Sequence, residues 1–326
     1  MYESFYKLRD KPFQLSPDPR FFFGSRSHKR AMAYLRYGVN QGEGFIVVTG
    51  DIGTGKTTLM RALFADLARE NVVAAQLVTT QLEADDMLRM VAASFGLAHE
   101  GVSKAALLKN LEVFLTARAR EGKRVLLMVD EAQNIPPRAL EELRMLSNFQ
   151  SGEKALLQSF LLGQEEFRHI LQSDGLEQLR QRVIAAYHLN PLDADETRAY
   201  IEHRLRMAGW TADPAFSEGA YTAIHEATGG IPRRINTFCD RLLLYGFLEE
   251  IHTIDEKAVA AVAEELRQEV PRTQGSVARH ERIASTGGTV ERRLAALEES
   301  VQTLQESIHQ ELGLIRRAVL RGGDEG

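Results

Sequence analysis

The chain has 326 residues, 44% of them hydrophobic, and its 40 basic and 45 acidic residues leave a formal net charge of -5. This length predicts two domains with appendages, and the negative balance excludes a global field that would hold the chain on DNA or anionic lipid. A single cysteine, Cys239, excludes an intrachain disulfide framework and is typical of a reducing compartment. The longest apolar runs are too short to span a bilayer and the start lacks the order of a signal peptide, so we expect a cytoplasmic protein.

Residues 1–41 form an aromatic, proline-bearing lead-in. It contains Pro12-Phe13, three consecutive phenylalanines at 21–23 and a helix-like segment at 27–37. Three consecutive phenylalanines need an apolar surface to pack against. We therefore expect this lead-in to pack on the core of the domain that follows.

A phosphate-binding loop follows the apolar run 45–48. The stretch reads Gly50-Asp51-Ile52-Gly53-Thr54-Gly55-Lys56-Thr57, and a helix-compatible run follows at 58–69. Glycines at this spacing let main-chain N–H groups face phosphate oxygens, and the following helix adds its positive N-terminal end. Lys56 is expected to reach the β- and γ-phosphates and Thr57 to ligate Mg²⁺. The residues expected to hold the nucleotide are Gly50, Asp51, Gly53, Thr54, Gly55, Lys56, Thr57 and Thr58.

Short β-branched or leucine-rich runs alternate with longer helical stretches from residue 45 to about 189. The expected strands are 45–48, 72–78, 125–129, 156–162 and 183–189. Such alternation predicts an α/β domain over 42–190, in which an open parallel sheet has helices on both faces.

An acidic pair ends the strand at 125–129. Asp130 and Glu131 follow this strand directly, and carboxylates at that end of a parallel strand face the phosphate loop. Asp130 is expected to hold Mg²⁺ through water or through Thr57. Glu131 is expected to orient and polarise the water that attacks the γ-phosphate.

A polar residue, Gln164, follows the strand at 156–162. This strand is expected to lie between the strands at 45–48 and 125–129 in the sheet. From there its side chain can sense the γ-phosphate or position the attacking water. A helix-capping role is the open alternative.

Three arginines are candidate catalytic groups. Arg180 and Arg182 precede the strand at the edge of the sheet, where a guanidinium can complete a neighbouring subunit's site or merely form surface salt bridges. Arg233 opens a helix after Gly229-Gly230-Ile231-Pro232 and is placed to reach back to the γ-phosphate.

The remainder of the chain is expected to be helical. Capping boxes at Asp193/Glu196 and Thr253/Glu256 open two helices of a small all-α lid domain at 191–268. A flexible linker is expected at 269–290 and a coiled-coil helix with a stutter at 291–322, although this helix can also fold back on its own body. Its apolar stripe consists of Leu294, Leu297, Val301, Leu304, Ile308, Leu312, Ile315 and Val319.

This order of motifs resembles the P-loop AAA+ ATPases. Within them, the chain is similar to the ExeA/GspA branch of secretion ATPases over about residues 1–268. The motifs that carry this resemblance are Pro12-Phe13, Pro17-Asp18-Pro19, Gly53-Thr54-Gly55-Lys56-Thr57-Thr58, Asp130-Glu131-Ala132-Gln133, Leu143-Arg144-Met145-Leu146-Ser147-Asn148, Gly163-Gln164 and Tyr200-Ile201-x-x-Arg204-Leu205. In place of the transmembrane and peptidoglycan-binding parts of ExeA, the sequence has the linker and the expected coiled coil. In that layout it is similar to the soluble ATPases associated with exosortase (PEP-CTERM) systems.

The resemblance implies ATP and Mg²⁺ as ligands, hydrolysis of ATP to ADP and phosphate, and a homo-oligomer. It also implies a protein partner in envelope export or exopolysaccharide assembly, which would bring the protein to the inner membrane without a transmembrane segment. Two other functions stay open. One is a DNA-associated regulator of the MuB/TniB transposition-helper type, against which the acidic balance weighs. The other is a nucleotide-gated scaffold that hydrolyses ATP slowly or not at all.

Overall fold

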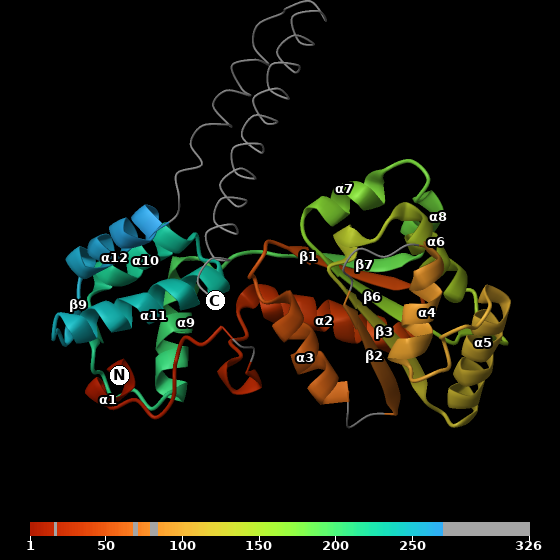
Figure 1. Ribbon diagram of the computed structural model, residues 1–326, viewed down its shortest axis with the longest axis horizontal. Helices are drawn as coiled ribbons and strands as arrows, with labels where there is room; N and C mark the ends of the chain where they lie inside the picture. Colours follow the sequence, from red (N-terminus) through yellow and green to blue (C-terminus); the bar gives the residue numbers. More distant parts are fainter. Residues whose placement is uncertain (16–17, 68–70, 79–83, 270–326) are drawn as a thin grey trace, which may run out of the picture. The chain divides into compact units, whose positions relative to one another are not determined.

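The computed structural model describes residues 1–15, 18–67, 71–78 and 84–269 (Figure 1). Residues Met1–Leu266 form one compact unit. The predicted coiled-coil helix at 291–322 and, apart from Glu269, the predicted linker at 269–290 lie outside the described residues. The predicted boundary between the nucleotide and lid domains, at 190/191, stays a prediction because both parts belong to this one unit. No helix among the described residues combines the length and apolar character needed to cross a membrane.

A parallel sheet of five strands organises the first part of the unit, in the order β2-β3-β6-β1-β7. The strands are β1 (Phe45–Gly50), β2 (Val72–Val78), β3 (Arg124–Asp130), β6 (Gln158–Gly163) and β7 (Val183–Leu189). A short antiparallel hairpin, β4 (Gln150–Ser151) and β5 (Lys154–Ala155), precedes β6. The predicted strands and the predicted place of β6, between β1 and β3, are confirmed.

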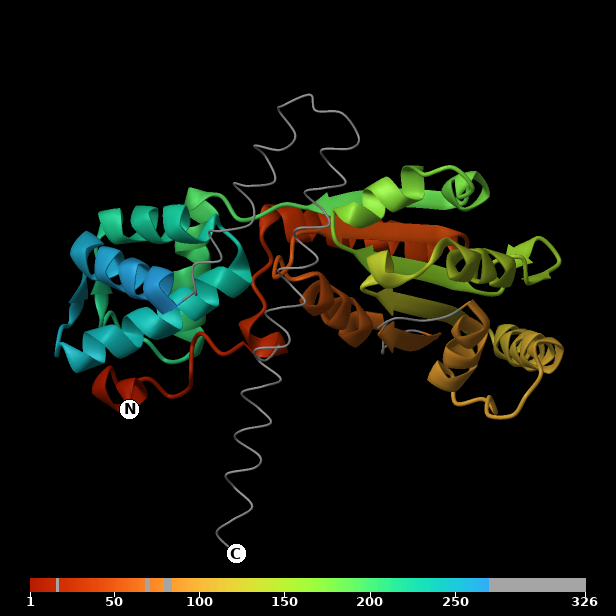
Figure 2. The ribbon, with the colours of Figure 1, turned by 45° about the horizontal axis from the view of Figure 1, so that its top comes forward.

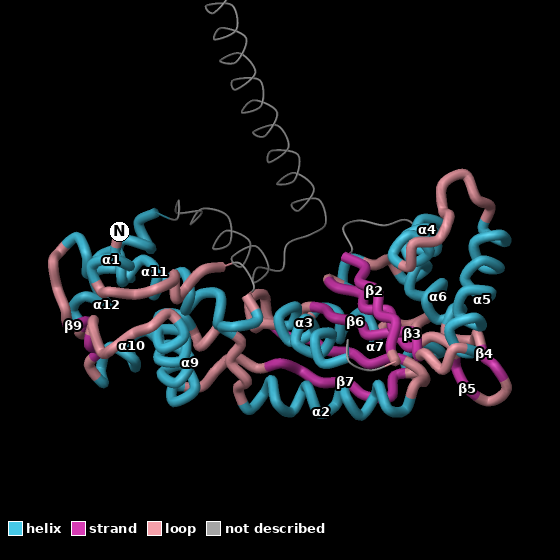
Figure 3. The backbone as a smooth tube through the Cα atoms, turned by 90° about the horizontal axis from the view of Figure 1, so that it is seen from below, coloured by secondary structure: helices cyan, strands magenta, loops and turns pink. Residues whose placement is uncertain are grey.

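Both faces of the sheet are covered by helices, as expected (Figure 2). Side chains alternate along β1, so that Phe45 and Val47 enter one core while Ile46 and Val48 enter the other. The first core is closed by α4 (Ala84–Ser94), α5 (Lys104–Arg120), α6 (Pro137–Leu146), α7 (Glu166–Gln172) and α8 (Glu177–Arg180). The second is closed by α2 (Arg26–Gln41), which runs beside β7 in Figure 3, and by α3 (Lys56–Leu67).

Four helices follow the sheet: α9 (Ala194–Met207), α10 (Glu218–Thr228), α11 (Pro232–Leu248) and α12 (Glu256–Glu269). The predicted Asp193 cap is present, since its carboxylate accepts a hydrogen bond from the Glu196 N–H at 2.9 Å.

Two details of this helical part differ from prediction. It is not purely helical, because β8 (Ala215–Phe216) pairs in parallel with β9 (Thr253–Ile254). This pairing places Thr253 in a strand, so α12 is capped instead by Asp255, whose Oδ1 accepts from the Ala258 N–H at 3.0 Å.

The first residues of the lead-in pack on the helical part, not on the core of the sheet domain as predicted. Tyr2, Tyr6, Leu8 and Phe13 are buried in the same cluster as the inner faces of the four helices. Polar atoms fix this docking: the Tyr2 hydroxyl donates to Asp240 and the Tyr6 hydroxyl donates to the Ile251 carbonyl at 2.9 Å. Apolar surface and satisfied hydroxyl groups therefore both favour the helical domain.

The lead-in reaches the sheet only later. The short α1 (Tyr2–Phe5) and the 3-10 turn η1 (Pro19–Phe21) precede α2. Phe22 packs beside the core under α2 and α3, whereas Phe23 packs against the helical cluster. The three phenylalanines thus bridge the two parts of the unit.

Candidate functional site

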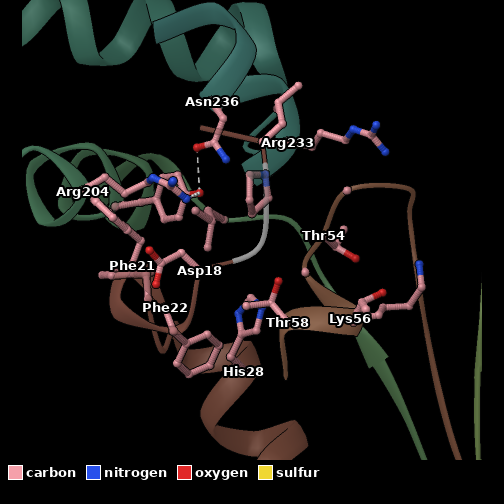
Figure 4. A pocket seen from close by; sticks show the side chains of 18 of the residues that line it. Asp18, Phe21, Phe22, His28, Thr54, Lys56, Thr58, Arg204, Arg233 and Asn236 are labelled. Carbon is pink, nitrogen blue, oxygen red and sulfur yellow. Dashed lines mark hydrogen bonds between the residues drawn. The ribbon is translucent and has the colours of Figure 1, made fainter. Parts of the chain in front are cut away.

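A cavity of about 290 Å³ opens where the lead-in, the phosphate loop and the helical part meet (Figure 4). Its phosphate-loop side is residues 52–58 with Glu131 nearby. The opposite side is lined by Asp18, Phe21, Phe22, Tyr200, Arg204 and Asn236, among others. The two sides differ in chemistry: one is the main chain of the loop with Lys56 and Glu131, and the other is a mixture of aromatic, polar and charged side chains.

The phosphate loop requires glycine at two positions. Gly53 and Gly55 have φ of +86° and +97°, which side-chain-bearing residues rarely adopt. A Cβ at Gly53 would lie 2.5 Å from the Arg233 Cβ, and one at Gly55 would lie 2.9 Å from Nε2 of His28. Because α3 begins at Lys56, its N-terminal N–H groups meet the loop. This arrangement suits a bound anion.

Lys56 is buried at the base of this loop, with 6% of its surface exposed. Its ammonium donates to the carbonyl oxygens of Gly50 at 2.7 Å and Asp51 at 3.0 Å. Burial lowers the pKa of Lys56, and the nearby carboxylates of Glu131 and Asp130 partly oppose this. A buried cation held by carbonyl dipoles has a strong preference for an anionic ligand.

Thr57 and Asp130 meet across the loop. The Thr57 hydroxyl donates to Oδ2 of Asp130 at 3.0 Å, and Oδ1 of the same carboxylate accepts from the Glu131 N–H at 3.0 Å. The end of β3 thus brings the predicted carboxylate to the predicted hydroxyl. Hydroxyl and carboxylate oxygens are the ligands that Mg²⁺ prefers, so the residues present fit that ion.

Glu131 lies in a left-handed backbone conformation, with φ of +54°. Its Oε2 accepts hydrogen bonds from Nε2 of Gln133 at 2.6 Å and from Nε2 of Gln164 at 3.2 Å. Burial raises the pKa of Glu131, but these two bonds and the charge of Lys56 outweigh it and lower the pKa overall. Glu131 is therefore held as a carboxylate at the pocket.

A closed ring of hydrogen bonds joins the ends of β3 and β6. Gln133 donates to Glu131 and also accepts, through Oε1, from the Gln164 N–H at 2.9 Å. The Gln164 side chain points to Glu131, whereas α7 carries no side-chain cap, so the capping alternative is not what the structure has. Sequence reasoning missed Gln133. Its place two residues after Glu131 was a signal, but its two hydrogen bonds depend on side-chain conformations that the strand order does not fix.

His28 is a second residue that sequence reasoning missed. Its ring is buried against Gly55, and its Nδ1 lies 2.7 Å from the hydroxyl of Ser25, the N-cap of α2. The Ser25 Oγ also accepts a hydrogen bond from the His28 N–H at 3.2 Å. Burial lowers the pKa of His28, opposed by a hydrogen bond to the main chain of Thr54. His28 therefore supports the loop as a neutral ring.

Arg233 reaches the loop through its main chain. Its N–H donates to the Gly53 carbonyl at 3.1 Å, at the first turn of α11, and its guanidinium is exposed beside the pocket (Figure 4). The helical part thus touches the phosphate loop through the main chain of Arg233, and the reach of its guanidinium to the γ-phosphate stays a prediction.

Arg180 and Arg182 do not reach this pocket. They precede β7, whose first residue pairs with Phe45 and whose last pairs with Gly50, so they lie about 20 Å from the loop along the sheet. Arg182 donates to the Ser147 hydroxyl at 2.9 Å and to Asn148, and the exposed Arg180 donates to the Leu171 carbonyl at 2.9 Å. Among the described residues, both bond to uncharged oxygens and not to the acidic partners of a surface salt bridge.

The fold and this site define the class of protein. The AAA domain family matches residues 39–171, a range that contains the phosphate loop, Asp130, Glu131 and Gln164. The chain therefore contains an AAA domain and has the α/β P-loop fold of AAA+ proteins, a class that in general binds and hydrolyses ATP.

One curated relative is General secretion pathway protein A of Aeromonas hydrophila, which is 39% identical over 267 residues. The match covers 82% of this chain and 48% of that protein, so the chain spans about half the length of this relative.

Solved structures support the fold alone. The ORC2 protein of Aeropyrum pernix superposes with a TM-score of 0.61 at 17% identity, covering 78% of this chain and 71% of its own. Cdc6p of Pyrobaculum aerophilum gives a TM-score of 0.61 at 16% identity, covering 78% and 70%.

Proposed function

We propose that the chain binds ATP in this pocket and hydrolyses it to ADP and phosphate. The observation that supports this most is the hydrogen bond between Thr57 and Asp130, with the ionised Glu131 as the next residue. The phosphates lie on the loop at 53–57, and the base lies on the aromatic side of the pocket. A protein that only binds nucleotide has no need of this second carboxylate.

Each residue at the loop has a role in this reaction. Thr57 and Asp130 hold Mg²⁺, which supplies positive charge to the phosphates when bound. Lys56 compensates charge on the β- and γ-phosphates. Glu131 orients the attacking water and accepts its hydrogen bond, and Gln164 holds Glu131 on the side of β6.

The active form is a homo-oligomer in which an arginine of one subunit completes the site of its neighbour. The distance of Arg180 and Arg182 from their own loop supports this, because a group that acts in another subunit must lie away from its own site. Arg180 is the stronger candidate, since it is exposed and donates only to the Leu171 carbonyl among the described residues, whereas Arg182 is half-buried and donates to both Ser147 and Asn148. Arg233 links the position of the helical part to the nucleotide that the phosphate loop holds.

In the cell, the chain acts as a nucleotide-driven switch or motor of envelope export at the cytoplasmic side of the inner membrane. The support is the likeness to a general secretion pathway protein over 82% of the chain. A role in an exosortase-associated exopolysaccharide system is the narrower form of this proposal, and it rests on the sequence layout alone.

A complementation assay tests the shared site. We expect Arg180→Ala and Lys56→Ala to reduce ATP turnover about 1000-fold each, while both proteins still fold. Mixing them should restore part of the turnover, because one subunit then supplies the arginine and the other an intact loop. Lys109→Ala, an exposed lysine on α5, is the control. Full activity of Arg180→Ala, or no recovery on mixing, would rule out Arg180 as the shared residue.

A further inference from the structure

A buried arginine holds the lead-in against the helical part. Arg204 of α9 is 7% exposed and lies beside the pocket. Its Nε donates to the Pro12 carbonyl at 2.5 Å and its Nη2 to the Gln14 carbonyl at 3.2 Å. The guanidinium also lies 5.0 Å from the centre of the Phe21 ring. One side chain therefore fixes three points of the lead-in, which is separated from it by about 190 residues.

The same guanidinium is linked to α11. Its Nη1 donates to the Tyr200 hydroxyl at 3.1 Å, and that hydroxyl donates to Oδ1 of Asn236 at 2.8 Å (dashed line in Figure 4). Asn236 lies one turn after Arg233, whose N–H donates to the Gly53 carbonyl. Polar contacts thus run from the lead-in through α9 and α11 to the phosphate loop.

Burial of the Arg204 guanidinium costs free energy. A guanidinium is expensive to bury, and within the described part of the chain the hydrogen bonds of Arg204 go to carbonyl and hydroxyl oxygens, while the Asp18 carboxylate acts on it only through its charge. The planar group makes three directed bonds while its face packs on an aromatic ring, which a flexible lysine cannot reproduce. Arg204 therefore holds the lead-in and Tyr200 in one defined arrangement.

The residues that Arg204 contacts form part of one end of the pocket. Phe21, Phe22, Tyr200 and Asn236 line the side away from the phosphate loop. Aromatic walls with a few fixed polar groups suit a planar heterocyclic base. Two of these walls, Phe21 and Tyr200, contact Arg204 directly.

We propose that Arg204 is a positioning residue that builds the base side of the nucleotide pocket by holding the lead-in on α9. This inference rests on the proposed function, because it assigns the base of the nucleotide to that side. Arg204 strengthens binding of the base without contributing to binding of the phosphates. The Tyr200-Ile201-x-x-Arg204 run therefore has a role in the site.

The test compares a ligand with a base and one without. Equilibrium binding of ADP and of inorganic tripolyphosphate is measured for the full chain and for Arg204→Lys, which keeps the charge but not the three directed bonds. We expect the Kd for ADP to rise at least about tenfold, since hydrogen bonds from a charged group are lost. The Kd for tripolyphosphate should change less than about twofold, because the loop is untouched.

Two controls keep the result interpretable. Arg206→Lys, an exposed arginine on the same helix paired with Glu202, should leave both constants unchanged. If thermal unfolding shows that Arg204→Lys does not fold, Tyr200→Phe removes the hydroxyl that joins Arg204 to Asn236 and keeps the ring. It should weaken ADP binding about threefold to tenfold and leave tripolyphosphate binding unchanged.

Unchanged ADP binding in the folded variant would overturn the inference, as would an equal loss for both ligands. Tripolyphosphate that fails to bind the wild-type chain would also contradict it, because the pocket would then lack a separate phosphate end. A wild-type chain that binds neither ATP nor ADP would refute the proposed function instead.

Discussion

The two ends of the pocket are built in different ways. At the phosphate end, the loop at 50–57 is a continuous stretch, and Asp130, Glu131 and Gln164 sit where two neighbouring strands end. At the other end, the walls come from the lead-in and from α9 and α11, and they are joined by the hydrogen bonds of Arg204. The first end is positioned by the sheet itself. The second depends on contacts between distant segments, so it can change while the sheet stays intact.

The largest expected effect is at the phosphate end. Lys56→Ala removes the one ammonium group among the described residues that line this pocket and should weaken binding of ATP, ADP and tripolyphosphate about 100-fold or more. Equilibrium binding measures this, with the exposed Lys109→Ala as control. Loss of binding for all three ligands would distinguish this end of the pocket from the base end. There, Arg204→Lys should weaken ADP binding but leave tripolyphosphate binding almost unchanged. Equal binding by Lys56→Ala and wild type would contradict the assignment of the loop.

An intermediate effect is expected at the ring of hydrogen bonds. Gln133→Ala removes the bond to Glu131 and the bond to Gln164, so turnover should fall about tenfold while ATP binding is kept. The pKa of Glu131 is lowered in the folded chain, and without Gln133 it should rise. Since the carboxylate is the active form, the acid limb of the kcat profile should move to higher pH.

A pH profile of ATP turnover checks this shift. Gln172→Ala, an exposed glutamine at the end of α7, should leave both the rate and the limb unchanged. A fall in turnover with an unmoved acid limb would mean that Gln133 acts on the fold and not on Glu131.

Much of the phosphate end could be predicted from the sequence. Its residues lie in one loop or directly after strands, and in a parallel sheet such positions converge on one edge regardless of the details of packing. The side chain of Gln164 could be placed near the site but its partner could not, because the strand order brings the ends of β3 and β6 together without saying which side chains bond there.

The base end could not be predicted. Arg204 and Pro12 are about 190 residues apart, and no local pattern indicates that a guanidinium on one helix binds carbonyls of the lead-in. The lead-in was expected to pack on the sheet, which holds for α2 but not for the residues before it, because aromatic residues indicate burial but not which core they enter. The cap of α12 was predicted at Thr253, but Thr253 lies in the two-residue strand β9 and Asp255 caps the helix instead.

The smallest expected effect is at the anchor of the lead-in. Tyr2→Phe removes the hydroxyl that donates to Asp240 and should lower the free energy of unfolding by about 1 kcal/mol. Chemical denaturation measures this, and Tyr37→Phe, which alters a ring that is 54% exposed, is the control. Nucleotide binding should be almost unchanged, because Arg204 still holds the segment nearer the pocket. Equal stability of both variants would show that this bond does not anchor the lead-in.

The most direct test of the central claim is to measure ATP binding and phosphate release by wild type and by Glu131→Gln. The amide keeps the shape of the side chain and one acceptor oxygen but removes the negative charge, so ATP should bind as in wild type. Phosphate release should fall about 100-fold to 10,000-fold, and Glu177→Gln on α8 should match wild type. A wild-type chain that binds ATP without turnover, or a Glu131→Gln variant that hydrolyses as fast as wild type, would contradict the assignment of this pocket as a hydrolytic site.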